Sequence, residues 1–344
     1  MVRASGACEF IDSLMEVAMD SSTDWANQPV FLKQTGQLHL EGAIGAFGKT
    51  FTIGRSFRAE KHNPSDGRHC MEFSLHEIEF KGEPDKLYDL LLDEINEFVL
   101  VQRDAVLANA ALIGLSASQA AAIKAWPQKF HRLTYSEAIA ELKASGEIIN
   151  WGDDFSHKQE LWLADKYGPV FLIKFPDPQW PHPELENRQL GIIKFFNMLP
   201  DGEGRINSAD LILPGAGESV GAAVRLHQLD LLRERLGSSI MFESLVQRRL
   251  DWFSRKGETA DRQKAEASVW ADFEPYFKQV ASHGAPHAGC GFGMNRLVQS
   301  LMGAAMIEDI DPYPVTYAGF TSQATAIQNK EVIESKTVPV AVTA

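Results

Sequence analysis

Two segments, far apart in the chain, each carry an arginine in a setting suited to binding phosphate. The first comprises residues 57–60 and 68–73 and contains Arg58. The second comprises residues 289–296 and ends on Arg296, directly after a glycine-rich stretch. A guanidinium group forms paired hydrogen bonds with phosphate oxygens, and glycines at the start of a helix let an anion approach the helix N-terminus. The two segments therefore predict a site for a nucleoside triphosphate.

The first segment is expected to lie on two antiparallel strands. Apolar residues keep a period of two in 51–57 and again in 71–75, which is the pattern of half-buried strands. The turn-rich residues 61–67 between them predict a hairpin with a mobile loop. Beyond this the apolar phase slips by one residue, so we expect a bulge near His76 or Glu77.

The rest of the chain alternates helices with connections. Periodicity and boundary residues predict helices at 10–19, 84–101, 135–145, 226–236, 262–280 and 295–302, with a helical or connecting stretch at 105–125. A buried strand is expected at 170–175 and a rigid, proline-rich loop at 177–183. The glycine-rich stretch is interpreted as a turn, and it lacks the spacing of a dinucleotide-binding fingerprint. We predict an α+β fold, an antiparallel sheet surrounded by helices, because the strands do not alternate with helices as in a doubly wound sheet.

Composition indicates a globular enzyme of the cytoplasm. Hydrophobic residues make up 44% of the 344 residues and charged residues 23%, which are ordinary values. The chain contains no apolar run of about 18 residues and no recognisable signal peptide at its start, so we expect no membrane partner. The cysteines, Cys8, Cys70 and Cys290, are too few and too scattered for a disulfide framework or a zinc site. Each is expected to be a small buried side chain in a reducing compartment.

The charge of the chain bears on its partners. The formal net charge is −13, whereas nucleic-acid binding depends on lysine and arginine contacts with phosphates. We therefore expect no large nucleic-acid interface.

Taken together, the arginine segments resemble the second and third signature motifs of class II aminoacyl-tRNA synthetases, most closely the asparaginyl/aspartyl branch. The resemblance covers residues 30–320, which we assign to a catalytic domain between a lead-in at 1–29 and a polar tail at 321–344. It implies ATP-dependent activation of a carboxylate as an acyl-adenylate. In that chemistry, positively charged groups stabilise the charge that develops on phosphate oxygens.

The resemblance also implies roles for the ATP-binding residues. Arg58 is expected to bind the α-phosphate and the substrate carboxylate, Arg296 the γ-phosphate, and Phe73 to stack on adenine. The nucleotide is expected to be surrounded further by Glu60, Arg68, His69, Glu218 and Gly293. The family usually has an acidic residue before the last arginine, and here Asn295 takes that place.

A magnesium site is implied beside the phosphates. Asp210 and Glu218 flank residues 211–217, in a stretch that is similar in spacing to asparaginyl-tRNA synthetases. Magnesium prefers oxygen ligands and keeps several waters. ATP and Mg²⁺ are therefore the expected cofactors.

Four residues are expected to bind the amino acid, again by resemblance. Gln37 would hold the α-amino group, Glu41 the side-chain amide, and Arg225 the side-chain carbonyl, with His287 closing over the substrate. Aspartyl enzymes place a lysine near Leu40, and Glu41 would repel a carboxylate, which favours asparagine over aspartate. Residues 221–223 depart from the Gly-Gly-Ser of the family, so the floor of the pocket is expected to differ.

The leading hypothesis is a ligase that adenylates asparagine or aspartate and transfers the acyl group to ammonia or another small amine. The N-terminal β-barrel that binds the anticodon and the first signature motif are not recognisable in the sequence, and tRNA is not the expected acceptor. Two alternatives remain: a minimal synthetase or tRNA-modifying transferase, and a catalytically silent paralog that senses an amino acid. We expect a homodimer, as the fold usually requires.

Overall fold

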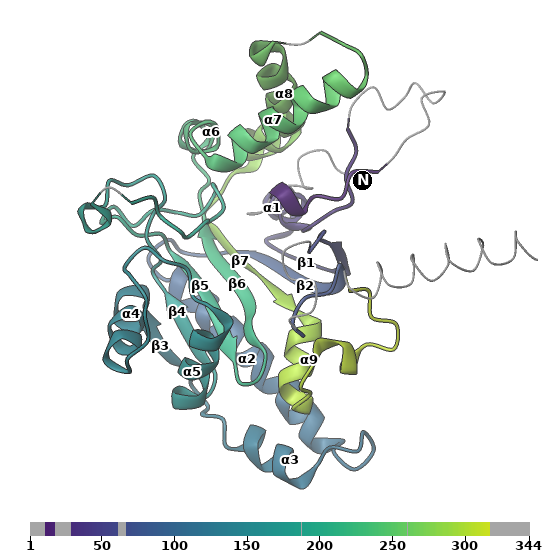
Figure 1. The fold of residues 1–344 in the computed structure, drawn as a ribbon, viewed down its shortest axis with the longest axis vertical. Helices are drawn as coiled ribbons and strands as arrows, with labels where there is room; N and C mark the ends of the chain where they lie inside the picture. Colours follow the sequence, from purple (N-terminus) through teal and green to yellow (C-terminus); the bar gives the residue numbers. More distant parts are fainter. Residues whose placement is uncertain (1–10, 18–28, 61–66, 187, 260, 317–344) are drawn as a thin grey trace, which may run out of the picture.

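The computed structural model describes residues 11–17, 29–60, 67–186, 188–259 and 261–316. Its centre is a seven-stranded sheet in the order β1-β2-β7-β6-β5-β4-β3. Every neighbouring pair of strands is antiparallel except the pair formed by β3 and β4. The strands are β1 (Lys49–Phe57), β2 (Glu72–Lys81), β3 (His131–Thr134), β4 (Val170–Ile173), β5 (Ser208–Leu213), β6 (Gly217–Arg225) and β7 (His287–Gly293). The predicted α+β class is confirmed (Figure 1).

Helices cover the sheet on both sides. They are α1 (Gln37–Phe47), α2 (Leu87–Ala108), α3 (Ala117–Lys124), α4 (Tyr135–Ala144), α5 (His157–Tyr167), α6 (Leu229–Gly237), α7 (Ile240–Arg255), α8 (Arg262–His283) and α9 (Met294–Met302). Short 3₁₀ turns lie at Ile11–Ser13, Pro183–Leu185 and Ile307–Ile310. In Figure 1, α2 passes behind the sheet and α6, α7 and α8 form a group at the top. Among the described residues, no helix is long and apolar enough to span a lipid bilayer.

Two hydrophobic cores hold these layers together. One lies between the sheet and α2, where Leu91 and Ile95 are fully buried against Phe171 and Phe292. The other joins α4, α5 and the group α6 to α8 around residues such as Phe273. Burial of this apolar surface is the main favourable contribution to folding. Between the two cores, one face of the central strands remains open to a cavity.

Several boundaries follow from local chemistry. The helix predicted at 135–145 is α4, and it begins with a capping box in which Thr134 and Glu137 bond each other's backbone N–H groups. The helix predicted from Pro84 is α2, which begins at Leu87 and ends at Ala108. The stretch 105–125 comprises the end of α2, a turn and α3, whose N-cap is Ser116. The buried strand predicted at 170–175 is β4.

Three expectations about local structure were wrong. Within 10–19, the described residues form a 3₁₀ turn, and Glu16 makes a bridge with Phe31 in place of a helix. The glycine-rich stretch is the central strand β7, not a turn. In β2 the pairing with β1 and β7 runs without a bulge at His76 or Glu77, and the register shift lies instead between β5 and β6.

The supposed bulge has a physical explanation. In a strand, alternate side chains face opposite sides, so Glu77 and Glu79 lie on the same side as Leu75. Both glutamates are buried there, while Ile78 packs on the α2 side. The apolar pattern of the sequence therefore changes phase because the cavity side of this regular strand carries buried acids in place of apolar residues.

Three other expectations fall partly or wholly outside the described residues. The loop predicted at 61–67 is described only at Gly67, the lead-in at 1–29 only at 11–17 and 29, and the tail at 321–344 not at all. Of the cysteines, Cys70 and Cys290 are free and buried, as expected, and Cys8 is outside the described part.

Candidate active site

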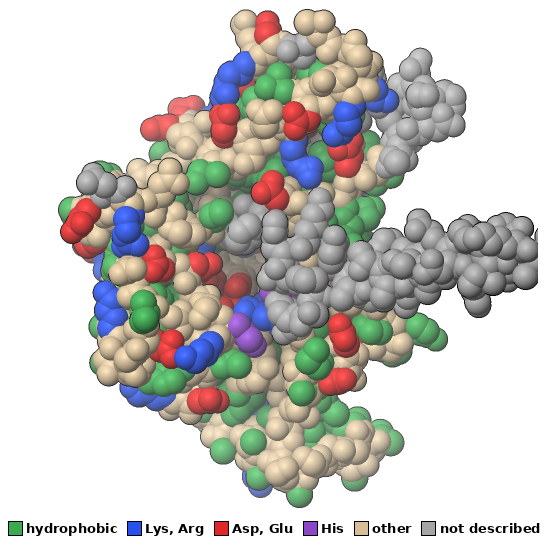
Figure 2. All heavy atoms as spheres, viewed as in Figure 1, with side chains coloured by type: hydrophobic (Ala, Val, Ile, Leu, Met, Phe, Trp, Pro, Cys, Tyr) green, Lys and Arg blue, Asp and Glu red, His purple; other side chains and the backbone are tan. Residues whose placement is uncertain are grey.

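The open face of the sheet forms the floor of a cavity of about 850 Å³. It appears as a hollow near the centre of the face shown in Figure 2, beside a histidine side chain and a basic one. The predicted residues that line it are Gln37, Arg58, Glu60, Arg68, His69, Phe73, Asp210, Glu218, Arg225, Gly293 and Arg296. Glu41 and His287 do not line the cavity but lie directly behind Arg225. The fold thus brings together residues spread over more than two hundred positions.

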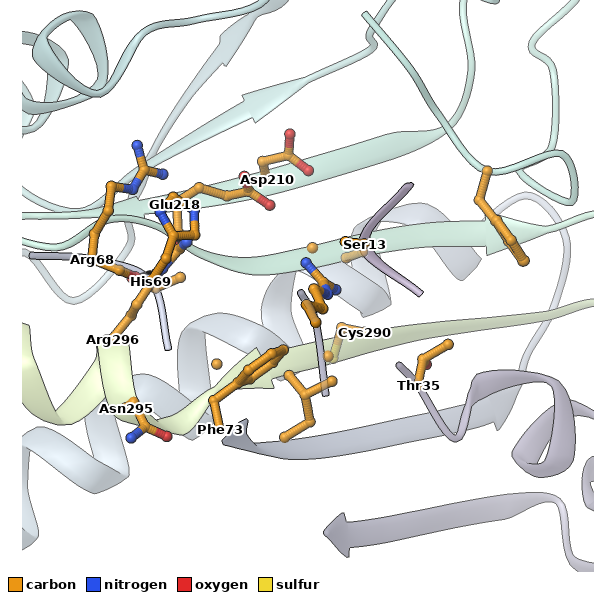
Figure 3. A pocket seen from close by; sticks show the side chains of 18 of the residues that line it. Ser13, Thr35, Arg68, His69, Phe73, Asp210, Glu218, Cys290, Asn295 and Arg296 are labelled. Atoms are coloured by element: carbon orange, nitrogen blue, oxygen red, sulfur yellow. Dashed lines mark hydrogen bonds between the residues drawn. The ribbon is translucent and has the colours of Figure 1, made fainter. Parts of the chain in front are cut away.

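Arg58 lies where β1 ends and the chain turns toward β2. Its backbone N–H donates to the carbonyl oxygen of Met71 at 2.9 Å, which ties the two strands together at this point. Its guanidinium carbon lies 5.3 Å from the centre of the Phe73 ring, a distance at which a cation is attracted to an aromatic face. The arginine and the phenylalanine are therefore neighbours in the lining of the cavity. Figure 3 labels Phe73 among the lining side chains.

Arg296 lies in the first turn of α9, and its side chain extends to the beginning of β6. Its guanidinium group donates to the carbonyl oxygens of Glu218 and Arg68. Burial and the positive charge of Arg68 both lower the pKa of Arg296. The guanidinium groups of Arg68 and Arg296 thus lie close together in a confined space. A bound anion with several negative charges would stabilise this arrangement.

A carboxylate from α5 lies among these arginines. Glu160 Oε2 is 3.3 Å from Arg68 Nη2 and accepts the backbone N–H of Glu218 at 3.1 Å. Burial by itself raises the pKa of Glu160, but the neighbouring His157 and the charges of Arg68 and Arg296 outweigh this effect and lower it. Glu160 is therefore an anion in the folded protein.

The two carboxylates expected to bind magnesium lie on neighbouring strands, Asp210 on β5 and Glu218 on β6. Lys194 Nζ lies 2.7 Å from Asp210 Oδ2, and both side chains are largely buried. The described residues contain no group of three or more metal-ligating side chains. One or two carboxylates together with phosphate oxygens suffice for Mg²⁺, so this pair fits a magnesium ion that a nucleotide brings with it.

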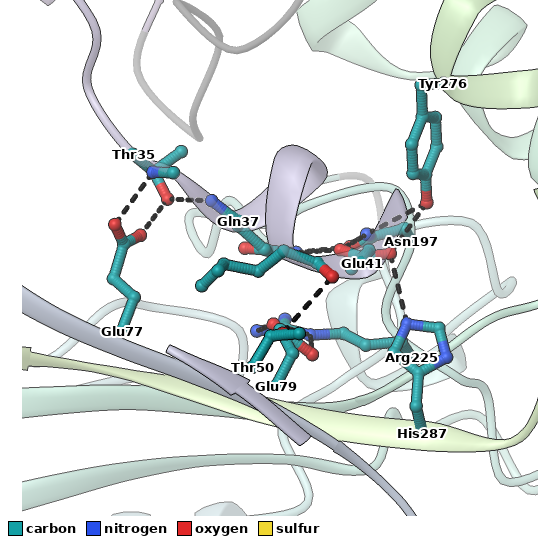
Figure 4. Close-up of polar contacts among 12 residues, drawn as sticks. Thr35, Gln37, Glu41, Thr50, Glu77, Glu79, Asn197, Arg225, Tyr276 and His287 are labelled. Atoms are coloured by element: carbon teal, nitrogen blue, oxygen red, sulfur yellow. Dashed lines mark hydrogen bonds and ion pairs between the residues drawn. The ribbon is translucent and has the colours of Figure 1, made fainter. Parts of the chain in front are cut away.

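The far end of the cavity is a buried network of charges (Figure 4). Arg225, at the end of β6, donates from Nη2 and Nε to Glu79 Oε1 at 2.8 and 3.1 Å. Both side chains are less than 5% exposed. Burial raises the pKa of Glu79 to about 7, although the charge of Arg225 opposes that rise. The two members of such a pair depend on each other, because burying either charge without its partner would cost several kcal/mol of stability.

Glu41, in α1, lies behind this pair and is hydrogen-bonded by four side chains. Its Oε1 accepts from Gln37 and Asn197, each at 2.7 Å. Its Oε2 accepts from Tyr276 at 2.8 Å and lies 3.3 Å from His287 Nε2. Burial raises the pKa of Glu41, but His287 and Arg225 lower it further than burial raises it.

His287 takes the opposite shift from its partner. Burial lowers its pKa, but Glu41 and Glu79 raise it by more, so the net pKa is raised. His287 Nδ1 is 2.7 Å from the carbonyl oxygen of Ala285, which fixes the ring so that Nε2 faces Glu41. His287 is thus placed to keep the carboxylate charged, not to touch a ligand in the cavity.

Gln37 and Glu77 stand at the entrance to this network. Gln37 Nε2 donates to Glu41 and, at 3.2 Å, to Asn197 Oδ1. Glu77, on β2, accepts the backbone N–H of Gly36 at 2.8 Å and the hydroxyl of Thr35. Both side chains line the cavity, and their oxygens could accept hydrogen bonds from an ammonium group.

Asn295 connects the glycine-rich strand to the rest of the site. Its Oδ1 accepts the backbone N–H of Ser74 at 3.0 Å, and its Nδ2 donates to Asp311 Oδ2 at 3.3 Å. An amide can do both at once, whereas a carboxylate at this position would face Asp311 without a proton to donate. The asparagine that replaces the acidic residue of the family therefore satisfies both of its neighbours, Ser74 and Asp311.

Sequence reasoning missed several residues of the site. Five of them contact predicted residues, namely Glu79, Glu160, Lys194, Asn197 and Tyr276. The sixth, Glu77, lines the same cavity and accepts the backbone N–H of Gly36. For the two glutamates of β2 the signal was present, since acids on the cavity side of an otherwise regular strand are unusual. The others lie in segments with no motif of their own, and only the fold places them at the cavity.

Comparison with known proteins agrees with the geometry. The family model described as class II tRNA synthetases (D, K and N) matches residues 14–317. The asparagine–tRNA ligase of Desulforamulus reducens is 31% identical over 316 residues, which are 90% of this chain and 61% of the relative. That of Pelotomaculum thermopropionicum is 29% identical over 315 residues, with the same coverage. The chain thus spans about 61% of the length of these relatives.

Solved structures show the same similarity. Asparaginyl-tRNA synthetase of Entamoeba histolytica, in complex with asparaginyl-adenylate, superposes with a TM-score of 0.63 at 25% identity, covering 90% of this chain and 60% of that chain. The enzyme of Pyrococcus horikoshii, also with asparaginyl-adenylate, gives a TM-score of 0.67 at 23% identity, covering 92% of this chain and 62% of that chain. The second comparison supports the fold alone.

Proposed function

Because the chain belongs to the class II tRNA synthetases of the D, K and N group, we propose that it is an ATP-dependent ligase that activates asparagine or aspartate. A carboxylate oxygen of the amino acid attacks the α-phosphorus of ATP, the bond to the β-phosphate breaks, and diphosphate leaves. An amine nitrogen then attacks the acyl carbon, AMP leaves with the bonding electrons, and the nitrogen loses a proton. The product is an amide.

One observation carries this proposal. A single cavity holds arginines at one end and, at the other, a buried network of opposite charges built around Arg225. The first end suits the phosphates of ATP and the second suits a small polar side chain. Placing the two ligands in one cavity turns their reaction into an effectively unimolecular step.

At the phosphate end, we assign Arg58 to the α-phosphate and the substrate carboxylate, and Arg296 to the γ-phosphate. Phe73, against which Arg58 packs, would stack on adenine. Glu60, Arg68, His69 and Gly293 line the cavity around them and complete the proposed nucleotide site. Asp210 and Glu218 would hold Mg²⁺, which when bound offsets negative charge on the phosphate oxygens.

At the amino-acid end, the network favours asparagine. Arg225 is paired with Glu79, and Glu41 is kept ionised by His287. The network already holds the carboxyl groups of Glu41 and Glu79 near the guanidinium of Arg225, so a second substrate carboxylate would add a further buried negative charge. A neutral amide can accept a hydrogen bond from Arg225 and donate one to Glu79, because both residues line the cavity. Gln37 and Glu77 would bind the α-amino group.

For the acceptor, we propose ammonia or another small amine. The net charge of −13 supports a small acceptor, because polyanionic tRNA would be repelled. A second candidate is transfer to tRNA, and the names of the two curated relatives favour it, since both are asparagine–tRNA ligases.

The proposal is tested by amino-acid-dependent exchange of labelled pyrophosphate into ATP, with all amino acids assayed singly. Exchange with asparagine is expected, and exchange with aspartate alone would overturn the assignment of the side-chain pocket. The acceptor is then identified by adding hydroxylamine, ammonium or a tRNA transcript and following the acyl group. Exchange with no amino acid, despite binding of ATP, would favour a catalytically silent paralog.

We also propose a homodimer, as is typical of the class. Phe47, Phe51 and Ile53 are each at least 67% exposed at the end of α1 and on the edge strand β1, where a second copy could cover them. Light scattering of the purified protein is expected to give twice the monomer mass. Replacing Phe51 and Ile53 by aspartate should yield monomers, and an unchanged mass would place the interface elsewhere.

A further inference from the structure

Two side chains of α5 line the cavity without a role in the site assigned so far. His157 is the first residue of the helix, and Glu160 lies one turn further on. Both belong to the wall of the cavity. They face the turn that precedes Glu218, at the end of the cavity where Arg68 and Arg296 lie.

Glu160 is the centre of a compact group of donors. One oxygen, Oε2, accepts the N–H of Glu218 at 3.1 Å, lies 3.3 Å from Arg68 Nη2 and lies 3.6 Å from His157 Nδ1. The Glu160 side chain is only 7% exposed and the Arg68 side chain 12%. A carboxylate that is buried this deeply is stable only with donors beside it. Glu160 therefore constrains the positions of the groups around it.

The backbone opposite is shaped to the pair. Gly217 has a φ of +74°, and a Cβ at this position would clash with both Glu160 Oε2 and His157 Nδ1. Only a residue without a side chain allows such a close approach. The turn, the carboxylate and the imidazole are thus packed as one unit against the strand that carries Glu218.

The charges of this unit match those of a diphosphate. The positive charge of Arg68 adds to burial in lowering the pKa of Arg296, and the negative charge of Glu160 acts in the opposite direction. The His157 side chain is one-third exposed, so its ring can reach a ligand in the cavity. An imidazole N–H can donate a hydrogen bond to a phosphate oxygen.

We propose that α5 is a third element of the site for the terminal phosphates of ATP. His157 binds the β- and γ-phosphate oxygens directly, and Glu160 is a positioning residue that holds Arg68 and His157 against the turn before Glu218. This inference rests on the proposed function in so far as ATP is the ligand, and it adds diphosphate, the leaving product, as a ligand of the same unit.

The test is equilibrium binding by titration calorimetry, with four ligands used singly: ATP, inorganic pyrophosphate, AMP and the sulfamoyl analogue of asparaginyl-adenylate. His157→Ala should weaken ATP and pyrophosphate about tenfold, the worth of one charge-assisted hydrogen bond. AMP and the sulfamoyl analogue, which lack the terminal phosphates, should change less than about twofold. Glu160→Gln should show the same selectivity, because Arg68 loses the negative charge that lies 3.3 Å from its Nη2.

The matched control is Lys158→Ala, on the same helix. Lys158 is 80% exposed and pairs with Glu147 away from the cavity, so its loss should leave all four affinities unchanged. Thermal unfolding of each variant shows whether the fold is intact, and His157→Gln offers a milder change that keeps a donor. Equal weakening of AMP and pyrophosphate, or no weakening at all, would overturn the inference.

Failure here is distinguishable from failure of the proposed function. If the wild type binds ATP and pyrophosphate through His157 but shows no exchange with any amino acid, the function fails and the inference stands. If exchange occurs normally and His157→Ala retains full affinity for pyrophosphate, the inference alone is wrong.

Discussion

The two ends of the cavity are built in opposite ways. At the amino-acid end, Arg225 and Glu79 are almost completely buried and paired with each other, and the buried Glu41 behind them accepts hydrogen bonds from its own set of donors, among them Tyr276. At the phosphate end, Arg296 is held by backbone carbonyl oxygens and Arg58 lies against an aromatic ring. The planar guanidinium group presents five N–H donors in a geometry that matches phosphate oxygens.

This difference suggests a division of roles: the amino-acid end determines substrate selectivity, and the phosphate end determines the rate of reaction. A network whose members already satisfy each other is rigid, and it admits only a ligand that fits its remaining donors and acceptors. The guanidinium groups at the phosphate end are instead placed to stabilise the charge that develops on phosphate oxygens during reaction. We therefore expect changes at the first end to alter stability and substrate choice, and changes at the second end to alter rate.

The largest effect is expected from Glu79→Ala. Removing the carboxylate leaves the buried guanidinium of Arg225 without its main partner, which should lower the free energy of unfolding by roughly 3–5 kcal/mol. Urea denaturation measures this change. Glu94→Ala serves as the control, because Glu94 forms an exposed pair with Lys49 and should cost less than about 1 kcal/mol. Equal costs for the two variants would mean that the buried pair is not interdependent.

The next effect concerns the phosphate end. Arg58→Ala and Arg296→Ala should each reduce the rate of pyrophosphate exchange by about 10²–10³-fold, the usual loss for one donor to a developing charge. Unfolding midpoints should change little. Arg262→Ala, at an exposed pair on α8, controls for the loss of an arginine. Unimpaired adenylate formation in either site variant would remove that arginine from the mechanism.

A pH dependence follows from the raised pKa of Glu79. Its folded pKa of about 7 lies above the ordinary 4.5, so between these values the folded protein binds a proton that the unfolded chain does not. The free energy of unfolding should therefore fall as pH rises from 4.5 to 7, by at most about 3 kcal/mol from this group. His287, with its raised pKa, contributes stability below pH 6.5 that is lost as pH rises further.

Glu79→Gln isolates the part due to the glutamate. Denaturation across pH 5 to 8 should show a shallower decline in the variant than in the wild type, because the titrating group is gone. Identical slopes would show that Glu79 does not titrate in this range and that the pair stays charged throughout.

The smallest effect is expected from Gly289→Ala. This variant also tests directly to which end of the cavity the glycine-rich strand belongs. A Cβ on Gly289 would clash with the carboxylate of Glu79, so the variant should cost about 1–3 kcal/mol of stability and raise the KM for the amino acid. A phosphate-binding turn would predict a raised KM for ATP instead. Steady-state exchange kinetics with each substrate varied in turn decides between them.

Part of the site could be predicted from residue types and spacing. The hairpin of β1 and β2, the helix that begins near Arg296 and the two arginines themselves follow from local patterns. Those patterns depend on neighbours within a few positions, where periodicity and glycine placement reflect burial and backbone freedom directly. The same local pattern predicted a turn in place of β7, because in sequence a glycine such as Gly289, which makes room for Glu79, cannot be told from a glycine that makes a bend.

What the sequence by itself determined is the chemistry of single residues: arginines for phosphate, carboxylates for a metal, and a pattern of strands and helices to carry them. Only the tertiary structure decided which charges neutralise each other. Glu79 and Arg225 are 146 positions apart, and Glu41 and His287 are 246 apart. The energy of a charge depends on its burial and on the distance to its partners in space, and the chain sets both only when it folds.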